Sequence, residues 1–96
     1  MKASVGPKAH RELADGALFY AREGGLDVGR AFIAEFERTL NLLTVHPELG
    51  ASWSRGRRRF PVRKFPYSIV YDIRGEELIV VALAHHRRKP GFWSSR

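Results

Sequence analysis

Two adjacent histidines near the end of this 96-residue chain, His85 and His86, can exchange protons near neutral pH. Metal-free cleavage of RNA needs a base for the 2′-hydroxyl, an acid for the leaving oxygen, and cations for the charge that develops on the phosphate. Arg63 and Arg88 could hold a phosphate, and Tyr71 could donate a proton. From these residues alone, endoribonuclease chemistry is one hypothesis.

Each candidate catalytic residue also has a structural interpretation. Tyr71 shares one face of a predicted strand with Ile69 and Ile73, which favours a core position with a hydrogen-bonded hydroxyl. His85 leaves an apolar strand and can cap it through a backbone hydrogen bond. No catalytic residue is therefore assigned firmly.

Metal chemistry is not expected. The spacing of the four histidines matches no ligand pattern, and the neighbours His85 and His86 should point to opposite faces of an extended strand. We expect neither a metal site nor another cofactor.

Positive charge is concentrated in the second half of the chain. Residues 1–50 carry six Lys/Arg against seven Asp/Glu, whereas residues 51–96 carry eleven against three. Thirteen of the seventeen cations are arginines, whose planar guanidinium suits phosphate or carboxylate. An anionic partner, either nucleic acid or an acidic protein segment, is favoured over a surface that charge merely keeps soluble. The predicted target-binding basic face consists of Arg57, Arg58, Arg59, Arg63, Lys64, Arg87 and Arg88.

Two tryptophans are candidate contact residues. Trp53 lies in a predicted loop beside Arg55 and Arg57, and we expect it to be exposed. Trp93 follows Phe92 after a Pro-Gly break, where the two rings could stack on bases. Such an aromatic pair more often folds back and seals the core, and we favour that interpretation.

The first half of the chain predicts a strand over residues 1–5 and two helices. The first helix should run over residues 7–23, with Gly16 as a weak point that costs about 1 kcal/mol relative to alanine. The second should be capped by Asp27 and end near His46, and the Gly-Gly pair between the helices predicts an antiparallel hairpin. The apolar face of the second helix comprises Val28, Phe32, Phe36, Leu40 and Leu43.

The second half predicts an irregular loop over residues 47–57 followed by three antiparallel strands. The strand over residues 58–62 should lie at an edge, because Pro61 cannot donate a ladder hydrogen bond. Residues 67–73 alternate like a half-buried strand, and the apolar run 78–84 should be covered on both faces. The prediction is an α+β fold in which an N-terminal strand and an antiparallel helical hairpin pack on a small antiparallel β-sheet. Residues 1–96 should form one domain.

The chain has no cysteine, no apolar signal core, and no apolar run long enough to cross a bilayer. These features predict a cytoplasmic protein without a membrane partner.

Four motifs at matching spacings resemble the RelE/ParE superfamily of bacterial toxins, most closely its ParE-like branch, often labelled plasmid stabilisation proteins. They are Tyr-Ala-Arg-Glu at 20–23, His-Pro-Glu-Leu-Gly at 46–50, Arg-Lys-Phe-Pro-Tyr-Ser-Ile-Val-Tyr at 63–71, and His-His-Arg-Arg-Lys-Pro-Gly-Phe-Trp at 85–93. The resemblance covers essentially the whole chain.

This resemblance implies a toxin of a type II toxin–antitoxin module, with an antiparallel sheet that cradles a helical hairpin. It also implies a cognate antitoxin, whose C-terminal segment would wrap across the toxin and neutralise it. A cationic sheet beside apolar grooves suits an amphipathic, acidic peptide. RelE-like members cleave messenger RNA in the ribosomal A site, whereas ParE-like members poison DNA gyrase without being nucleases.

The residues favour the non-catalytic branch. RelE-like nucleases rely on several lysines and an arginine, and on a tyrosine near the C-terminus, whereas this chain has four lysines and its C-terminal aromatic residues are Phe92 and Trp93. Neither ring can replace a phenol as a proton donor. Inhibition of DNA gyrase is the favoured activity. The alternatives are a ribosome-dependent RNase that uses His85 or His86 with Arg63 and Arg88, and a non-toxic member that only binds an antitoxin.

Overall fold

The computed structural model describes residues 1–87, so the predictions for Arg88 and for the Phe92–Trp93 pair lie outside the described residues. The elements are β1 (Lys2–Val5), α1 (Pro7–Gly24), α2 (Leu26–Val45), β2 (Ala51–Ser52), a short 3-10 turn (Ser54–Gly56), β3 (Arg58–Pro61), β4 (Tyr67–Arg74) and β5 (Glu77–His85).

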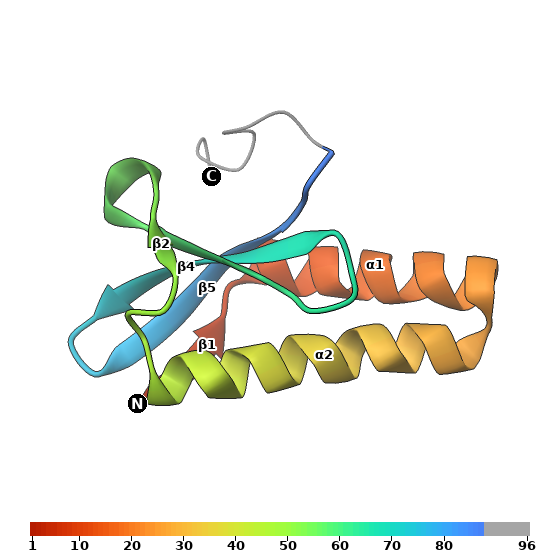
Figure 1. Ribbon diagram of the computed structural model, residues 1–96, viewed down its shortest axis with the longest axis horizontal. Coiled ribbons are helices and arrows are strands. Elements are labelled where there is room, and N and C mark those ends of the chain that lie inside the picture. Colours follow the sequence, from red (N-terminus) through yellow and green to blue (C-terminus); the bar gives the residue numbers. More distant parts are fainter. Residues whose placement is uncertain (88–96) are drawn as a thin grey trace.

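The sheet has the strand order β1-β5-β4-β3-β2, and the α1–α2 hairpin lies along one of its faces (Figure 1). The predicted α+β fold is confirmed, and β3, β4 and β5 form the expected antiparallel meander. β1, however, pairs parallel to β5, with Lys2 opposite Glu77 and Val5 opposite Val80. The sheet is therefore mixed rather than antiparallel throughout, because local periodicity does not encode the direction of a partner strand that is distant in the chain.

The loop predicted over residues 47–57 contains the short strand β2. It pairs Ala51 with Arg59 and Ser52 with Arg58, so the first half of β3 is not at the edge of the sheet, contrary to prediction. Pro61 lies beyond the reach of β2, where its missing N–H breaks no ladder. A two-residue strand is too short to produce a periodic signal in the sequence.

The second helix begins two residues earlier than a cap at Asp27 would allow, at Leu26. Gly25 is the N-cap, and its φ of 96° lets the chain reverse direction between the two helices. Asp27 instead lies in the first turn, where its carboxylate interacts favourably with the helix dipole. The predicted end of the helix is confirmed, since α2 stops at Val45 and His46 is its C-cap.

The core lies between the helical hairpin and the sheet. Phe32, Phe36 and Leu43 of α2 are buried there, as the predicted apolar face requires. They pack with Ala9, Val62, Ile69, Tyr71, Leu78, Val80 and Leu83. Within residues 1–87, neither helix is both long and apolar enough to span a membrane.

The sheet is covered more fully than the alternation in β4 predicts. Ser68 and Val70 are buried as well as Ile69 and Tyr71, so β4 is not half-buried in its first half. Val70 belongs to a second cluster with Ala82 and Ala84, against which Trp53 packs. β5 is covered on both faces over residues 82–84, as predicted, but Ile79 and Val81 remain partly exposed.

Gly16, predicted to be a weak point of α1, is the site of a close helix contact. It is buried, and a Cβ atom added there would lie 2.7 Å from Cε2 of the fully buried Phe32. The absence of a side chain therefore lets α1 approach α2, which offsets the poor helix propensity of glycine.

We expect Gly16→Ala to lower the free energy of unfolding by about 1–3 kcal/mol, because the new methyl group overpacks the core against Phe32. Chemical denaturation with helical circular dichroism as the signal measures this. The control is Asp15→Ala at the exposed neighbouring position, which should leave stability unchanged or raise it. A more stable Gly16→Ala variant would mean that propensity outweighs packing here.

Candidate functional site

The three consecutive arginines of the predicted basic face do not point the same way. Arg58 reaches the loop after α2, where its Nη1 donates to the carbonyl oxygens of Gly50 at 2.8 Å and Glu48 at 3.2 Å. Arg57 is largely buried, and its Nε lies 3.7 Å from Oδ2 of Asp72. Arg59 lies with its guanidinium carbon 4.9 Å from the centroid of the Trp53 ring. All three cations therefore have contacts within the protein.

Trp53 is half-buried, whereas the prediction was an exposed contact residue. Its ring packs on the cluster of Val70, Ala82 and Ala84, on the face of the sheet away from the core. Its backbone N–H donates to the carbonyl oxygen of Arg57 at 2.6 Å, which closes the loop beneath Arg59. Arg59 and Trp53 together form a cation–π pair that covers this face.

A different set of cations gathers at one end of the sheet. Arg63 and Lys64 are exposed in the connection between β3 and β4, and Lys64 adopts a left-handed φ of 72°. The N–H of His86 donates to the carbonyl oxygen of Pro66 at 2.8 Å, which brings the exposed Arg87 to the same end. Of the predicted basic face within residues 1–87, these three cations are the exposed ones.

Tyr71 is a core residue with a satisfied hydroxyl, as predicted. Its ring is fully buried, and its hydroxyl donates to the carbonyl oxygen of Pro47 at 2.7 Å and accepts from the N–H of Gly50 at 3.0 Å. Burial raises the pKa of Tyr71, partly opposed by the Gly50 hydrogen bond and the charge of Arg58. This geometry leaves the hydroxyl unable to reach a substrate.

The two histidines point to different sides of the sheet, as predicted. The ring of His85 packs edge-on against Tyr67, and its Nδ1 accepts the backbone N–H of Arg87 at 3.1 Å, which confirms the predicted backbone cap. The Nε2 of His86 lies 2.8 Å from Oγ of the buried Ser68. Their separation means that the two imidazoles cannot act on one substrate atom as an acid–base pair. No group of three possible metal ligands occurs within residues 1–87.

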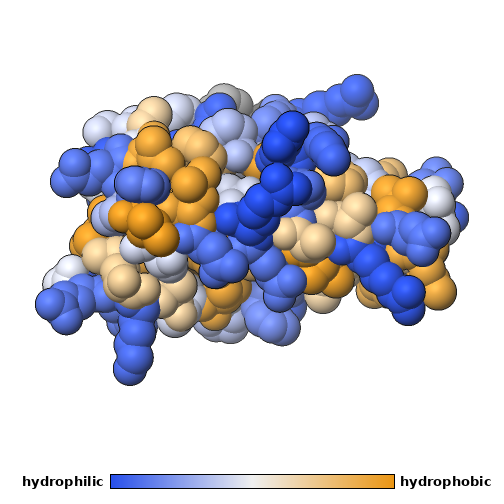
Figure 2. All heavy atoms as spheres, turned by 60° about the horizontal axis from the view of Figure 1, so that its bottom comes forward, coloured by the Kyte–Doolittle hydropathy of each residue, from blue (hydrophilic) through white to orange (hydrophobic). Residues whose placement is uncertain are grey.

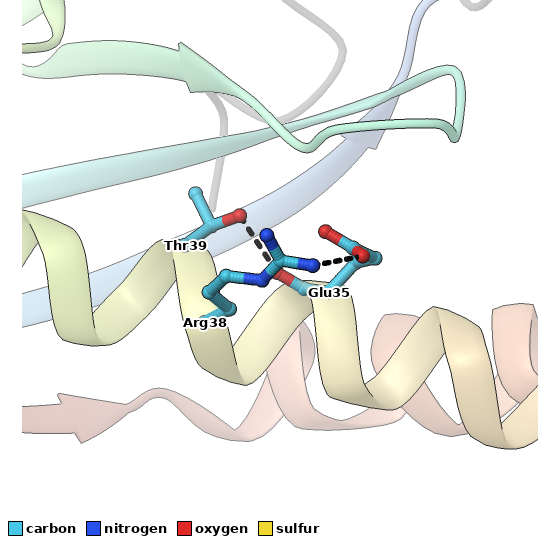
Figure 3. A network of polar contacts seen from close by, with 3 residues as sticks. All are labelled: Glu35, Arg38 and Thr39. Carbon is cyan, nitrogen blue, oxygen red and sulfur yellow. Dashed lines mark hydrogen bonds and ion pairs between the residues drawn. The ribbon is translucent and has the colours of Figure 1, made fainter.

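A groove between α2 and β3 was missed by the sequence analysis. It encloses about 410 Å³ and is lined by Glu35, Arg38, Thr39, Leu42, Phe60, Pro61, Val62 and Arg63. Glu35 is buried, and its Oε2 accepts from Nη2 of Arg38 at 2.6 Å (Figure 3). The hydroxyl of Thr39 donates to the carbonyl oxygen of Glu35 at 2.7 Å in the same network. Glu35, Arg38 and Leu42 lie beside the core face of α2, at helical spacing, and this spacing was the available signal. Hydrophobic periodicity identifies the core face of a helix and does not detect a neighbouring mixed row.

Comparisons with known proteins identify the family. Residues 4–90 match the family described as ParE toxin of the type II toxin–antitoxin system parDE, and the chain belongs to this family. A solved structure described as the chromosomal ParDE TA system from P. aeruginosa has the same fold, with a TM-score of 0.79 at 16% sequence identity. That alignment covers 88% of this chain and 95% of the other. A search of curated proteins found no match.

The family match confirms the resemblance predicted from the four motifs. Because a type II system pairs a toxin with an antitoxin, membership implies a cognate antitoxin as partner.

We expect Tyr71→Phe to lower the free energy of unfolding by about 1–3 kcal/mol, since it leaves the Pro47 carbonyl and the Gly50 N–H without their partner. Chemical denaturation at neutral pH measures the loss. Tyr20→Phe is the matched control, because the Tyr20 hydroxyl makes no hydrogen bond within residues 1–87, and it should change stability much less.

The same variant has a pH signature. Since the pKa of Tyr71 in the folded chain is raised above its ordinary value of 10.0, its contribution to stability is complete below that pH and is lost as the pH rises above it. Wild-type stability should therefore fall more steeply above pH 10 than that of Tyr71→Phe. Equal slopes would show that the hydroxyl does not titrate abnormally.

The arginines should separate into two classes on substitution. We expect Arg58→Ala to destabilise the chain by about 1–3 kcal/mol, because it removes the donor to the loop carbonyls. Arg63→Ala should change stability by less than about 0.5 kcal/mol, because the side chain is exposed. Thermal unfolding of the two variants side by side tests this, and equal losses would contradict the assignment of Arg58 as a support of the loop.

Proposed function

We propose that this chain is a toxin that inhibits DNA gyrase, acts in the cytoplasm as a single domain, and is neutralised by its cognate antitoxin. The observation that carries the proposal is the match of residues 4–90 to the ParE toxin family. Gyrase as the target follows from the ParE-like branch of the resemblance.

The contacts of the candidate acid–base groups support a non-catalytic toxin over a nuclease. Tyr71 is buried with both hydrogen-bonding directions of its hydroxyl occupied. His85 packs on Tyr67, and His86 contacts Ser68, so each ring makes a structural contact with β4 at the end of the sheet. General acid–base catalysis needs such groups within reach of one substrate, and that requirement is not met by these rings.

The exposed cations at the end of the sheet are the proposed target contacts. Arg63, Lys64 and Arg87 have no ion pair among the described residues, so they can pair with an anionic partner without first losing an internal one. Arg88, beyond the described residues, continues this set in the sequence. Arg57, Arg58 and Arg59 are not part of this set, because they contact Asp72, the loop after α2 and Trp53, respectively.

We expect the purified chain to inhibit ATP-dependent supercoiling of relaxed plasmid by gyrase. The double variant Lys64→Glu/Arg87→Glu should lose about tenfold or more in potency, because it reverses two exposed charges at the proposed contact. Lys2→Glu/Arg30→Glu is the matched control, with the same change of net charge at exposed positions elsewhere, and should stay active.

Wild-type protein that leaves gyrase untouched but cleaves messenger RNA on purified ribosomes would replace the proposal with the RelE-like alternative. A chain that does neither, and whose induced expression leaves growth unchanged, would be a non-toxic member that only binds an antitoxin.

A further inference from the structure

Two residues other than glycine have a left-handed backbone within residues 1–87, and both are cations. Arg55 has a φ of 62° and Lys64 a φ of 72°. An L-residue is strained in this region because its Cβ atom approaches the following carbonyl oxygen, so glycine or asparagine is the usual occupant. Strain of this kind collects at functional sites, where the side chain is needed for another reason.

Arg55 lies at the tip of the loop between β2 and β3. The N–H of Arg57 donates to the carbonyl oxygen of Ser54 at 3.3 Å, which makes Arg55 and Gly56 the central pair of a tight turn. Gly56 also has a positive φ, of 75°, so the turn has type I′ geometry, for which Asn-Gly is the favoured sequence. The exposed Arg55 is therefore not the residue that the turn itself selects.

Lys64 lies at the tip of the next loop, between β3 and β4. The N–H of Val62 donates to the carbonyl oxygen of Tyr67 at 2.8 Å and closes this loop. The Lys64 side chain is exposed, and within residues 1–87 it makes no hydrogen bond, ion pair or cation–π contact. Backbone preference, packing and pairing do not account for a lysine here, which leaves a contact outside the chain.

Both tips belong to a segment without negative charge. Residues 51–71 carry five arginines and one lysine and no Asp or Glu. Since Arg55 precedes β3 and Lys64 follows it, the two cations extend from opposite ends of this strand (Figure 1). They are nine residues apart in the chain, so their separation is at most about 30 Å. An anion that meets both tips must carry negative charge over an extended surface.

These loops lack the apolar surface of a protein–protein interface, which is built around buried apolar or aromatic anchors. The large apolar side chains that are exposed within residues 1–87 lie outside residues 50–72 and include Leu18, Leu26 and Val45 of the helices. Figure 2, which brings the α2 side of the molecule forward, shows apolar patches there between hydrophilic side chains. A contact made of cations with little apolar area is typical of binding to the phosphate backbone of a nucleic acid.

Duplex DNA also supplies charge at both tips. It carries one negative charge per about 1.7 Å of helix axis, so its charge is continuous over the distance between Arg55 and Lys64. An acidic patch on a protein would have to place its carboxylates at two particular points.

We propose that Arg55 and Lys64 contact the phosphate backbone of duplex DNA from the two ends of β3. The chain keeps cations at these two left-handed positions for that contact, at a cost in stability. The choice of DNA as the source of the phosphates rests on the proposed function, since DNA is the substrate of gyrase.

The test measures binding of the full chain to a short, fluorescently labelled DNA duplex by anisotropy, without gyrase, over a series of salt concentrations. Each phosphate contact contributes about −0.9 to the slope of log K against log salt. Arg55→Asn/Lys64→Gly should therefore reduce the magnitude of the slope by about 2 and weaken binding several-fold at low salt. Lys64→Arg keeps the cation and should bind like the wild type.

Arg30→Gly is the matched control, because it removes an exposed cation from α2, outside the two loops, and it should keep the slope of the wild type. Thermal unfolding then separates a contact from a support of the fold. Lys64→Gly relieves the left-handed strain and should raise the midpoint by a few degrees. Arg30→Gly should lower the midpoint, since glycine is unfavourable inside a helix. A lysine with a purely structural role would lose stability on substitution and leave DNA binding unchanged.

The outcomes separate this contact from the toxin function. If DNA binding depends on the two cations but gyrase is not inhibited, the DNA contact stands by itself and the proposed function fails. If the wild type inhibits gyrase but does not bind the duplex, or binds it no less after Arg55→Asn/Lys64→Gly, the DNA contact is overturned and the toxin function stands. Equal losses for Arg30→Gly would attribute binding to net charge alone, and tighter binding of single-stranded RNA would replace DNA as the partner. Either result overturns the proposal.

Discussion

The hydroxyl of Tyr71 joins the central strand β4 to the loop after α2, and the rest of the structure depends on this connection. The ring is buried between the helical hairpin and the central strand β4, while the hydroxyl binds the backbone of Pro47 and Gly50 beyond the end of α2. A Cβ atom at Gly50 would lie 2.5 Å from that hydroxyl, so glycine permits the approach. One side chain thus fixes the path from α2 to β2, and with it the position of Leu49.

The same path explains why the arginines of β3 play different roles. Alternation along a strand sends neighbours to opposite faces. Arg58 therefore turns to the loop that Tyr71 holds, while Arg59 turns to Trp53 on the outer face of the sheet. A count of charges treats these residues as equivalent to Arg63 and Lys64, yet the latter are free to meet solvent or a partner. Exposure and pairing, more than charge density, separate structural cations from candidate contacts.

The fold tolerates great variation in sequence, since the ParDE structure that resembles it shares 16% identity with a TM-score of 0.79. What this chain uses to make the fold is an apolar face on each layer, together with a close helix contact at Gly16. Such requirements constrain residue size and polarity rather than identity. The surface around that core is then available for partners, and it includes the groove between α2 and β3 and the cations at the sheet end.

By itself, the sequence determined the elements with strong local signals. The two helices, the β4–β5 hairpin, the core position of Tyr71 and the opposite orientation of His85 and His86 all follow from periodicity and turn residues within short segments. The family resemblance was also readable from motifs within the chain.

Tertiary structure decided what depends on residues distant in the chain. The parallel pairing of β1 with β5, the strand β2, the burial of Ser68 and Val70 on the outer face, and the groove between α2 and β3 all arise from long-range contacts. Hydrophobic burial depends on the area that a neighbour covers, and it is the fold that supplies the neighbour. For that reason the sequence could name the cations, whereas the fold determined which of them remain available to a partner.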